Sequence, residues 1–140
     1  MISNLTSFCD SLPSPEELSP LDLAFAGDAV FELLVREELL RGGRRPVKTL
    51  HAMSVERVRA SSQAKGAAAI LPLLSEEEAD VYRRARNAKV GGVPKNASAA
   101  EYHAATALEA LFGWLWLKGN TDRIMQLYAV ISEGACTEDD

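Results

Sequence analysis

Apolar residues recur along this chain at the three- to four-residue spacing of helices, and no segment alternates with the two-residue period of a strand. The first apolar stretch follows Ser19 and Pro20, which suit the N-cap and first position of a helix. It continues to about Leu40 and stops at the Gly42-Gly43 pair, a common helix terminator. The pattern therefore predicts one long helix between these signals.

Proline, glycine and capping signals divide the rest of the chain into further helical segments. These segments are 47–71 with a break near Ser61-Ser62, 76–87, 99–117 and 121–133. The stretch 88–97 contains two glycines and a proline and is expected to be a loop. We therefore expect an all-α domain over residues 19–134, with a loose lead-in over 1–18 and a short acidic tail over 135–140.

Composition is typical of one globular domain: 140 residues, of which 47% are hydrophobic and 25% charged. No apolar run approaches the roughly 20 residues of a membrane-spanning helix, and the N-terminus lacks the pattern of a secretory signal. Cys9 and Cys136 stand near opposite ends of the chain, without metal-ligand spacing. We expect a cytoplasmic protein with no membrane partner.

Charge is unevenly distributed along the chain, although its net value is −5. Residues 1–35 contain six acids and no lysine or arginine, and residues 96–140 contain two bases and seven acids. Residues 36–95 contain thirteen bases and seven acids, a net of +6. A basic surface built from the middle of the chain is therefore possible on an acidic protein.

Two apolar helical stretches each contain a lone acid, Asp28 in the first and Glu109 in the fourth. Small residues stand beside both: Ala24 and Gly27 near Asp28, and Ala105 and Gly113 near Glu109. An ionised carboxylate in apolar surroundings needs a compensating partner. Two such helices could face each other across a hydrated divalent cation, with the small residues leaving room for its waters. Partly exposed or hydrogen-bonded structural acids are the alternative.

Two motifs around these acids, Gly27-Asp28-Ala29-Val30 and the stretch 106–113, resemble the paired signatures of the ribonuclease III catalytic domain. The resemblance is closer to the mini-ribonuclease III family, which lacks the appended double-stranded-RNA-binding domain. The resemblance extends from about Leu21 to Ile131. Further motifs that support it are Leu50-His51, Ser62-Gln63-Ala64, the stretch 83–89 and Pro94-Lys95-Asn96. It implies an all-α homodimeric endonuclease that cuts double-stranded RNA with Mg²⁺, for which Mn²⁺ could substitute. Family members trim ribosomal RNA precursors, typically 23S RNA of the large subunit.

The resemblance makes Asp28 and Glu109 the catalytic, metal-holding acids, with metal-activated water as the nucleophile. Ala24 and Thr106 stand where full-length ribonuclease III has two further acids, a substitution that the mini family shares. Glu32, one turn after Asp28, is a secondary candidate, for which a surface ion pair is the favoured role.

The candidate RNA-binding residues lie in the basic middle of the chain, because duplex RNA is recognised mainly through phosphates and 2′-hydroxyls. They are Arg83, Arg84, Arg86, Asn87, Lys89, Lys95 and Asn96, with Arg57, Arg59 and Lys65 second. His51 and His103 are expected to be structural or at the surface. Phe25 is expected to contribute to the dimer.

Two other classes remain open on the sequence. One is a non-catalytic module of the same fold that binds double-stranded RNA, and the other is a helical adaptor without RNA affinity. The sequence leaves open the cut position, any sequence preference and any accessory ribosomal protein.

Overall fold

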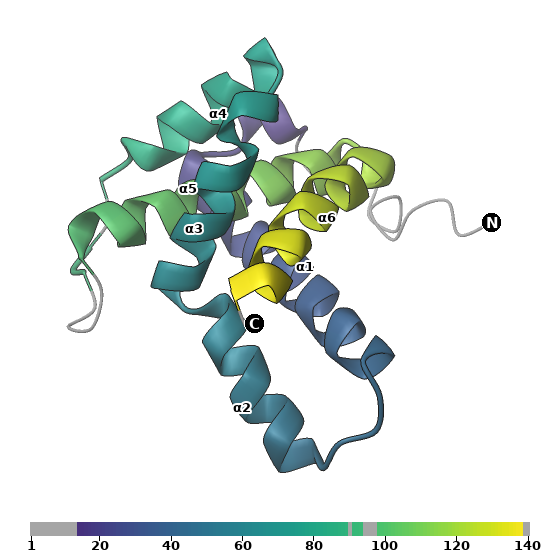
Figure 1. The fold of residues 1–140 in the computed structure, drawn as a ribbon. Helices are drawn as coiled ribbons and strands as arrows, with labels where there is room; N and C mark the ends of the chain where they lie inside the picture. Colours follow the sequence, from purple (N-terminus) through teal and green to yellow (C-terminus); the bar gives the residue numbers. More distant parts are fainter. Residues whose placement is uncertain (1–13, 90, 94–97, 139–140) are drawn as a thin grey trace.

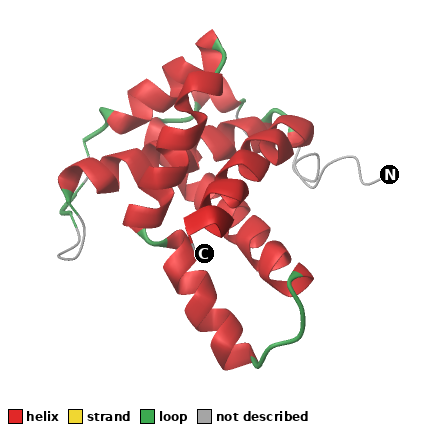
Figure 2. Cartoon of the chain, in the orientation of Figure 1, coloured by secondary structure: helices red, strands yellow, loops and turns green. Residues whose placement is uncertain are grey.

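Helices form every regular element of the part of the chain that the structure describes, which confirms the all-α prediction (Figures 1 and 2). The computed structural model describes residues 14–89, 91–93 and 98–138. The α-helices are α1 (Pro20–Arg41), α2 (Val47–Val58), α3 (Ala60–Ile70), α4 (Glu76–Arg86), α5 (Ala99–Leu117) and α6 (Thr121–Glu138). Two short 3₁₀ turns, η2 (Pro15–Glu17) and η3 (Leu71–Leu73), complete the described elements. None of these described helices combines the length and apolar character that crossing a membrane requires.

Capping boxes fix the starts of three helices where the sequence predicts them. In each, a serine hydroxyl accepts a hydrogen bond from a backbone N–H, and an acid three residues later accepts one from the serine N–H. The pairs are Ser19 with Asp22 on α1, Ser75 with Glu78 on α4, and Ser98 with Glu101 on α5.

Three local predictions need correction. The break between α2 and α3 falls at Arg59, which is extended, rather than at the serine pair. Instead, the Ser62 hydroxyl donates to the carbonyl of Glu56 at 2.8 Å and satisfies the end of α2. Helix α6 continues through Gly134 to Glu138, beyond the predicted end at residue 133. The lead-in contains η2, and Leu18 packs against the core.

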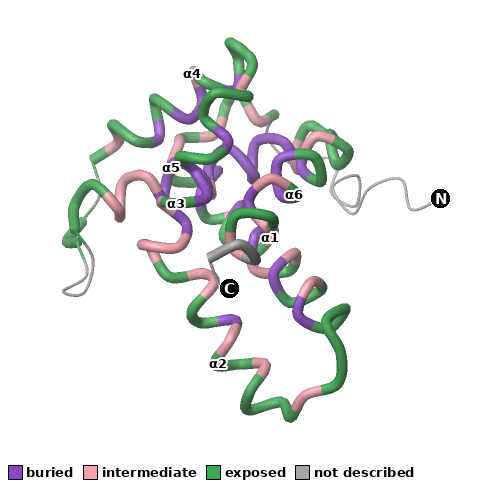
Figure 3. Tube along the Cα trace, in the orientation of Figure 1, coloured by how far each residue is buried: buried purple, intermediate pink, exposed green. Residues whose placement is uncertain are grey.

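Helix α5 is the centre of the domain and packs against α1, α3, α4 and α6 (Figure 1). Its residues 105–115 are buried except Glu109, which is half-buried (Figure 3). Phe112, Leu108 and Leu111 are fully buried in this core. A helix that is apolar around its whole circumference is expected to lie inside a domain, so the observed burial agrees with its sequence.

Two glycines bring α1 and α5 into backbone contact. A Cβ atom on Gly27 would lie 1.6 Å from the carbonyl oxygen of Glu109, and one on Gly113 would lie 2.0 Å from the carbonyl oxygen of Leu23. The expectation that these glycines leave room for a hydrated cation is therefore wrong, because the opposing backbone fills that space. Their role is to let the two acid-bearing helices approach each other.

A polar cluster centred on Glu38 ties α1 to α2 and α6. The Glu38 carboxylate accepts hydrogen bonds from Arg57 at 2.7 Å, from the Tyr128 hydroxyl at 2.6 Å and from the Ser132 hydroxyl. Helix α2 extends from the body of the domain beside the C-terminal part of α1, and its Leu50, Met53 and Val58 pack against the core (Figure 1). The cluster therefore helps to fix the position of α2.

Acidification should weaken this cluster. Burial alone would raise the pKa of Glu38, but hydrogen bonds from Ser132, Tyr128 and Arg57 outweigh it and the pKa lies below its ordinary value of 4.5. The carboxylate therefore stabilises the fold fully above pH 4.5, and the contribution disappears as pH falls through its lower folded-state pKa. Thermal unfolding of Glu38→Gln should show a lower midpoint than wild type at pH 7 and a smaller loss on acidification. The exposed neighbour variant Glu37→Gln should follow wild type; equal pH profiles for all three proteins would contradict this role.

Candidate active site

Asp28 on α1 and Glu109 on α5 meet where the two helices are in contact, and their carboxyl groups share a hydrogen bond. Burial and the Asp28 charge raise the pKa of Glu109 to about 8, while a hydrogen bond from Gln63 opposes the increase. In the absence of a cation, burial and the nearby Asp28 charge therefore favour the protonated form of Glu109 at neutral pH. The two acids are brought together as the sequence suggested. Their surroundings differ from the expectation, because Asp28 is exposed to solvent and Glu109 is half-buried.

Two polar residues, Gln63 and Thr106, are relevant to the surroundings of Glu109. The Gln63 amide Nε2 on α3 donates to Glu109 Oε2 at 3.3 Å. The Thr106 hydroxyl, one turn before Glu109, donates to the carbonyl oxygen of Tyr102 at 3.0 Å. The hydroxyl of Thr106, which stands where ribonuclease III has a further acid, is therefore used within α5, whereas Gln63 contacts Glu109 directly.

The donor set fits a hard divalent cation that retains most of its water. The pKa of Glu109 is shifted by burial, by Asp28 and by Gln63. No cationic side chain of the described chain is among the causes of this shift. Within the described ranges, no cluster of three or more histidine, cysteine, aspartate or glutamate side chains is placed to hold a metal. Mg²⁺ is commonly bound through one or two carboxylates while it keeps several waters. Asp28 and Glu109 would hold it, and its binding would displace the proton of Glu109.

Several secondary candidates form ion pairs. Glu32 pairs with Arg36 at 3.4 Å on the exposed side of α1. This is the surface ion pair that the sequence favoured for Glu32. Arg57 is engaged in the Glu38 cluster. Arg59 pairs with Glu56 at 2.9 Å. Lys65 is exposed on α3.

The primary basic residues gather at the C-terminal end of α4. Arg83 and Arg84 are exposed and both pair with Asp80, one turn earlier on the helix. Lys95 and Asn96 lie outside the described residues. We call the open hollow of about 610 Å³ between the end of α4 and the start of α5 the basic hollow. Its lining residues are Arg86, Asn87, Ala88, Lys89, Val93, Ala100 and His103.

His103 adds an unpaired hydrogen-bonding atom to the basic hollow. Its Nδ1 atom is buried and has no hydrogen-bond partner among the residues that the structure describes. A buried polar atom without a partner costs about 1–3 kcal/mol, so this atom is a place where the described structure lacks a hydrogen bond. His103 lies six residues before Glu109, about 9 Å along the axis of α5.

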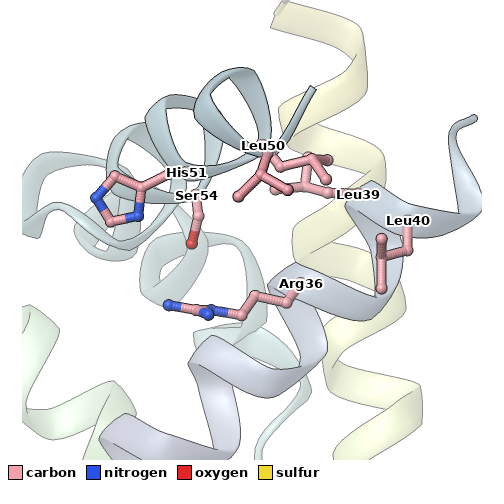
Figure 4. A pocket seen from close by; sticks show the side chains of 7 residues that line it. Arg36, Leu39, Leu40, Leu50, His51 and Ser54 are labelled. Atoms are coloured by element: carbon pink, nitrogen blue, oxygen red, sulfur yellow. The ribbon is translucent and has the colours of Figure 1, made fainter. Parts of the chain in front are cut away.

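A second hollow of about 210 Å³ lies between α1 and α2 and contains none of the predicted site residues (Figure 4). Leu39 and Leu40 of α1 and Leu50 of α2 give it an apolar lining. Arg36, His51 and Ser54 add polar groups at its edge. The expectation that His51 is a surface residue agrees with its exposure here.

A helical domain with paired carboxylates on two touching helices is the arrangement of a ribonuclease III domain. The sequence model of the family described as "Ribonuclease III domain" matches residues 21–120. A crystal structure of a protein from Fusobacterium nucleatum superimposes with a TM-score of 0.77 at 33% identity, covering 85% of this chain and 95% of that chain.

Similar proteins identify the family within the class of ribonuclease III domains. Mini-ribonuclease 3 from Symbiobacterium thermophilum is 46% identical over 116 residues, which is 83% of this chain and 89% of the relative. Mini-ribonuclease 3 from Gloeobacter violaceus is 50% identical over 102 residues, 73% of each chain. The chain belongs to the mini-ribonuclease III family, as its motifs indicated.

Sequence reasoning missed two residues at these places. Gln63 stands within the Ser62-Gln63-Ala64 motif, but nothing in the sequence shows that α3 brings its amide to Glu109. His103 lies one helical turn after the cap of α5, and only the packing of α4 beside it creates the hollow. Both need the tertiary structure to be found.

Proposed function

We propose that this protein is a Mg²⁺-dependent endoribonuclease that hydrolyses phosphodiester bonds in double-stranded RNA. The observation that supports it is the Asp28–Glu109 pair, two adjacent carboxyl groups of which Glu109 has a pKa raised by burial and by the Asp28 charge. Membership of the mini-ribonuclease III family supports the same chemistry.

Asp28 and Glu109 would hold the metal from two sides of the α1–α5 contact. Bound Mg²⁺, or Mn²⁺ in its place, supplies an activated water for attack and stabilises charge on the leaving 3′ oxygen. The backbone contact at Gly27 keeps the spacing of the carboxylates rigid. No side-chain nucleophile is required of this chain.

The decisive experiment is incubation of purified protein with a long RNA duplex, with and without Mg²⁺. Cleavage only with Mg²⁺ supports the proposal. If the duplex binds but stays intact under every condition, the protein is a binding module; if it does not bind at all, an adaptor role is favoured instead.

We further propose that the natural substrate is a precursor of 23S ribosomal RNA, processed in the cytoplasm. The family resemblance supports this substrate. Comparison of an in vitro 23S precursor with an unrelated duplex of the same length would test it: one preferred cut in the precursor supports the substrate, and indiscriminate cutting of both contradicts it.

The basic hollow is proposed to bind the RNA backbone, with His103 as one contact. His103→Phe should weaken binding of a short RNA duplex in EDTA about fivefold, because one hydrogen bond to phosphate or 2′-hydroxyl is lost. The matched control is His51→Phe, which changes the other histidine of the chain and should bind as wild type does. Affinity should also fall steeply as salt rises, since neutralised phosphates release counterions. Equal affinities for both variants, or a flat salt response, would exclude the hollow.

The active form is proposed to be a homodimer that covers the exposed face of α1. Apolar side chains on that face remain accessible, and Phe25 is 86% exposed. The strip consists of Leu21, Phe25, Leu33 and Leu40, which fall within roughly a third of the helix circumference. Asp28 lies beside it, so a second copy would place its own site nearby and provide two centres for two strands.

Phe25→Glu should convert the dimer into monomers, because a charge would replace a large apolar side chain buried between the copies. Analytical ultracentrifugation at micromolar concentration should show a halved mass. Met125→Glu, which places the same charge on an exposed apolar position of α6, should leave the mass of wild type. A wild-type protein that is monomeric in this measurement would contradict the dimer.

A further inference from the structure

The Asp28–Glu109 pair has one buried neighbour on a third helix. Gln63 is 3% exposed and lies on α3, which packs against α5. Its amide Nε2 donates to Glu109 Oε2 at 3.3 Å. A buried side chain has few alternative rotamers, so this donor has a fixed position relative to the carboxylate.

The hydrogen bond restricts how the Glu109 carboxylate can turn. One carboxylate oxygen is bound from the protein side by Gln63, so rotation of the group would break that bond. Glu109 would then keep an oxygen available on the side of Asp28, with which it already shares a hydrogen bond. The orientation of the pair is therefore set from inside the domain.

A neutral amide also suits this place chemically. A lysine or arginine would neutralise the carboxylate pair and repel a divalent cation, whereas an apolar residue would leave a half-buried carboxylate without a donor. A glutamine provides the donor without a charge. It therefore stabilises ionised Glu109 and leaves the negative charge of the pair for the metal.

We infer that Gln63 is a positioning residue, which orients the Glu109 carboxylate for the divalent cation that the proposed function requires. It acts through Glu109 and does not itself touch the reacting atoms. A hydrogen bond to a metal-binding side chain typically changes metal affinity or activity 10- to 100-fold when it is removed. A glutamine that merely fills the space between α3 and α5 would have no such effect.

The wild-type protein allows a direct test, because the chain contains only two glutamines, Gln63 and Gln126. Gln126 is exposed on α6 and accepts a hydrogen bond from Arg123 at 3.2 Å. Titration with diamagnetic Mg²⁺, followed by NMR of the side-chain amides, should shift the Gln63 signals and leave those of Gln126 unchanged. If calorimetry shows Mg²⁺ binding while the Gln63 signals stay in place, the inference is wrong and the proposed function stands.

Variants give a second readout that does not depend on turnover. Gln63→Met, which retains the length and volume of the side chain but lacks the donor, should weaken Mn²⁺ binding about 10-fold or more in an electron paramagnetic resonance titration. Gln126→Met is the matched control and should bind as wild type does. In a Glu109→Gln background, Gln63→Met should cause no further loss of Mn²⁺ affinity, since Gln63 acts through that carboxylate.

The outcomes separate the two proposals. A folded Gln63→Met protein with the Mn²⁺ affinity of wild type would overturn the inference alone. If Gln63→Met does not fold, the wild-type NMR titration decides. If wild-type protein binds neither Mg²⁺ nor Mn²⁺, the proposed function fails and the inference fails with it.

Discussion

Replacing Asp28 by asparagine should reduce Mg²⁺-dependent cleavage of duplex RNA by about a thousandfold or more. The change removes one of only two carboxylates that would hold the metal, and the electrostatic stabilisation supplied there is worth about 4 kcal/mol on this scale. Glu109→Gln should have an effect of the same size. Single-turnover cleavage of a labelled duplex at saturating protein concentration measures both losses without interference from product release.

Folding and RNA binding should survive these substitutions. In the metal-free protein Glu109 is half-buried beside another acid, and its pKa of about 8 means that raising the pH destabilises the fold above the unfolded-state pKa of 4.5. Glu109→Gln removes this destabilising ionisation. At pH 8 in EDTA the variant should therefore unfold at a temperature equal to or above that of wild type. Glu37→Gln, an exposed acid on α1, is the activity control. Full activity of Asp28→Asn would overturn the metal assignment.

Gly27→Ala should abolish the fold or cost more than about 4 kcal/mol of unfolding free energy, an exceptional effect for a single methyl group. The added Cβ would lie 1.6 Å from the carbonyl oxygen of Glu109 and 2.5 Å from its carbon, both backbone atoms that cannot turn away. Helices α1 and α5 would have to separate along their contact. Denaturant unfolding followed by circular dichroism measures the loss.

Gly134→Ala provides the matched control, because Gly134 lies on helix α6 and a Cβ there would meet nothing within 4 Å. This variant should be about 0.5–1 kcal/mol more stable than wild type, as expected for alanine in an exposed helix. Any Gly27→Ala protein that does fold should lose cleavage, since the carboxylates would be displaced from each other. Wild-type stability for Gly27→Ala would contradict the close contact of α1 and α5.

Much of the fold was predictable because its signals are local. A capping box depends on two residues three positions apart, so Ser19, Ser75 and Ser98 mark helix starts in the sequence itself. The position of the break at Arg59 was not predictable in the same way. There the Ser62 hydroxyl satisfies the end of α2, a contact that follows from the angle between two helices.

The sequence context identifies Asp28 and Glu109, but its prediction that the neighbouring glycines leave room for a hydrated cation is wrong. Small residues next to a carboxylate are compatible with two roles: they can leave space for water, or they can let another helix pack closely. The distinction depends on which helix faces which, and Gly27 lies against the backbone of α5. Asp28 likewise seemed to lie in apolar surroundings, although its side of α1 faces solvent.

The sequence by itself determined the helices, the two acids and the family to which the chain belongs, because periodicity, caps and motifs are properties of neighbouring residues. Only the tertiary structure decided that glycine contact brings the acids together, that Gln63 reaches Glu109 from α3, and that His103 lies in the basic hollow. These contacts join residues far apart in the chain, and they exist only after helix packing has fixed the distances between side chains.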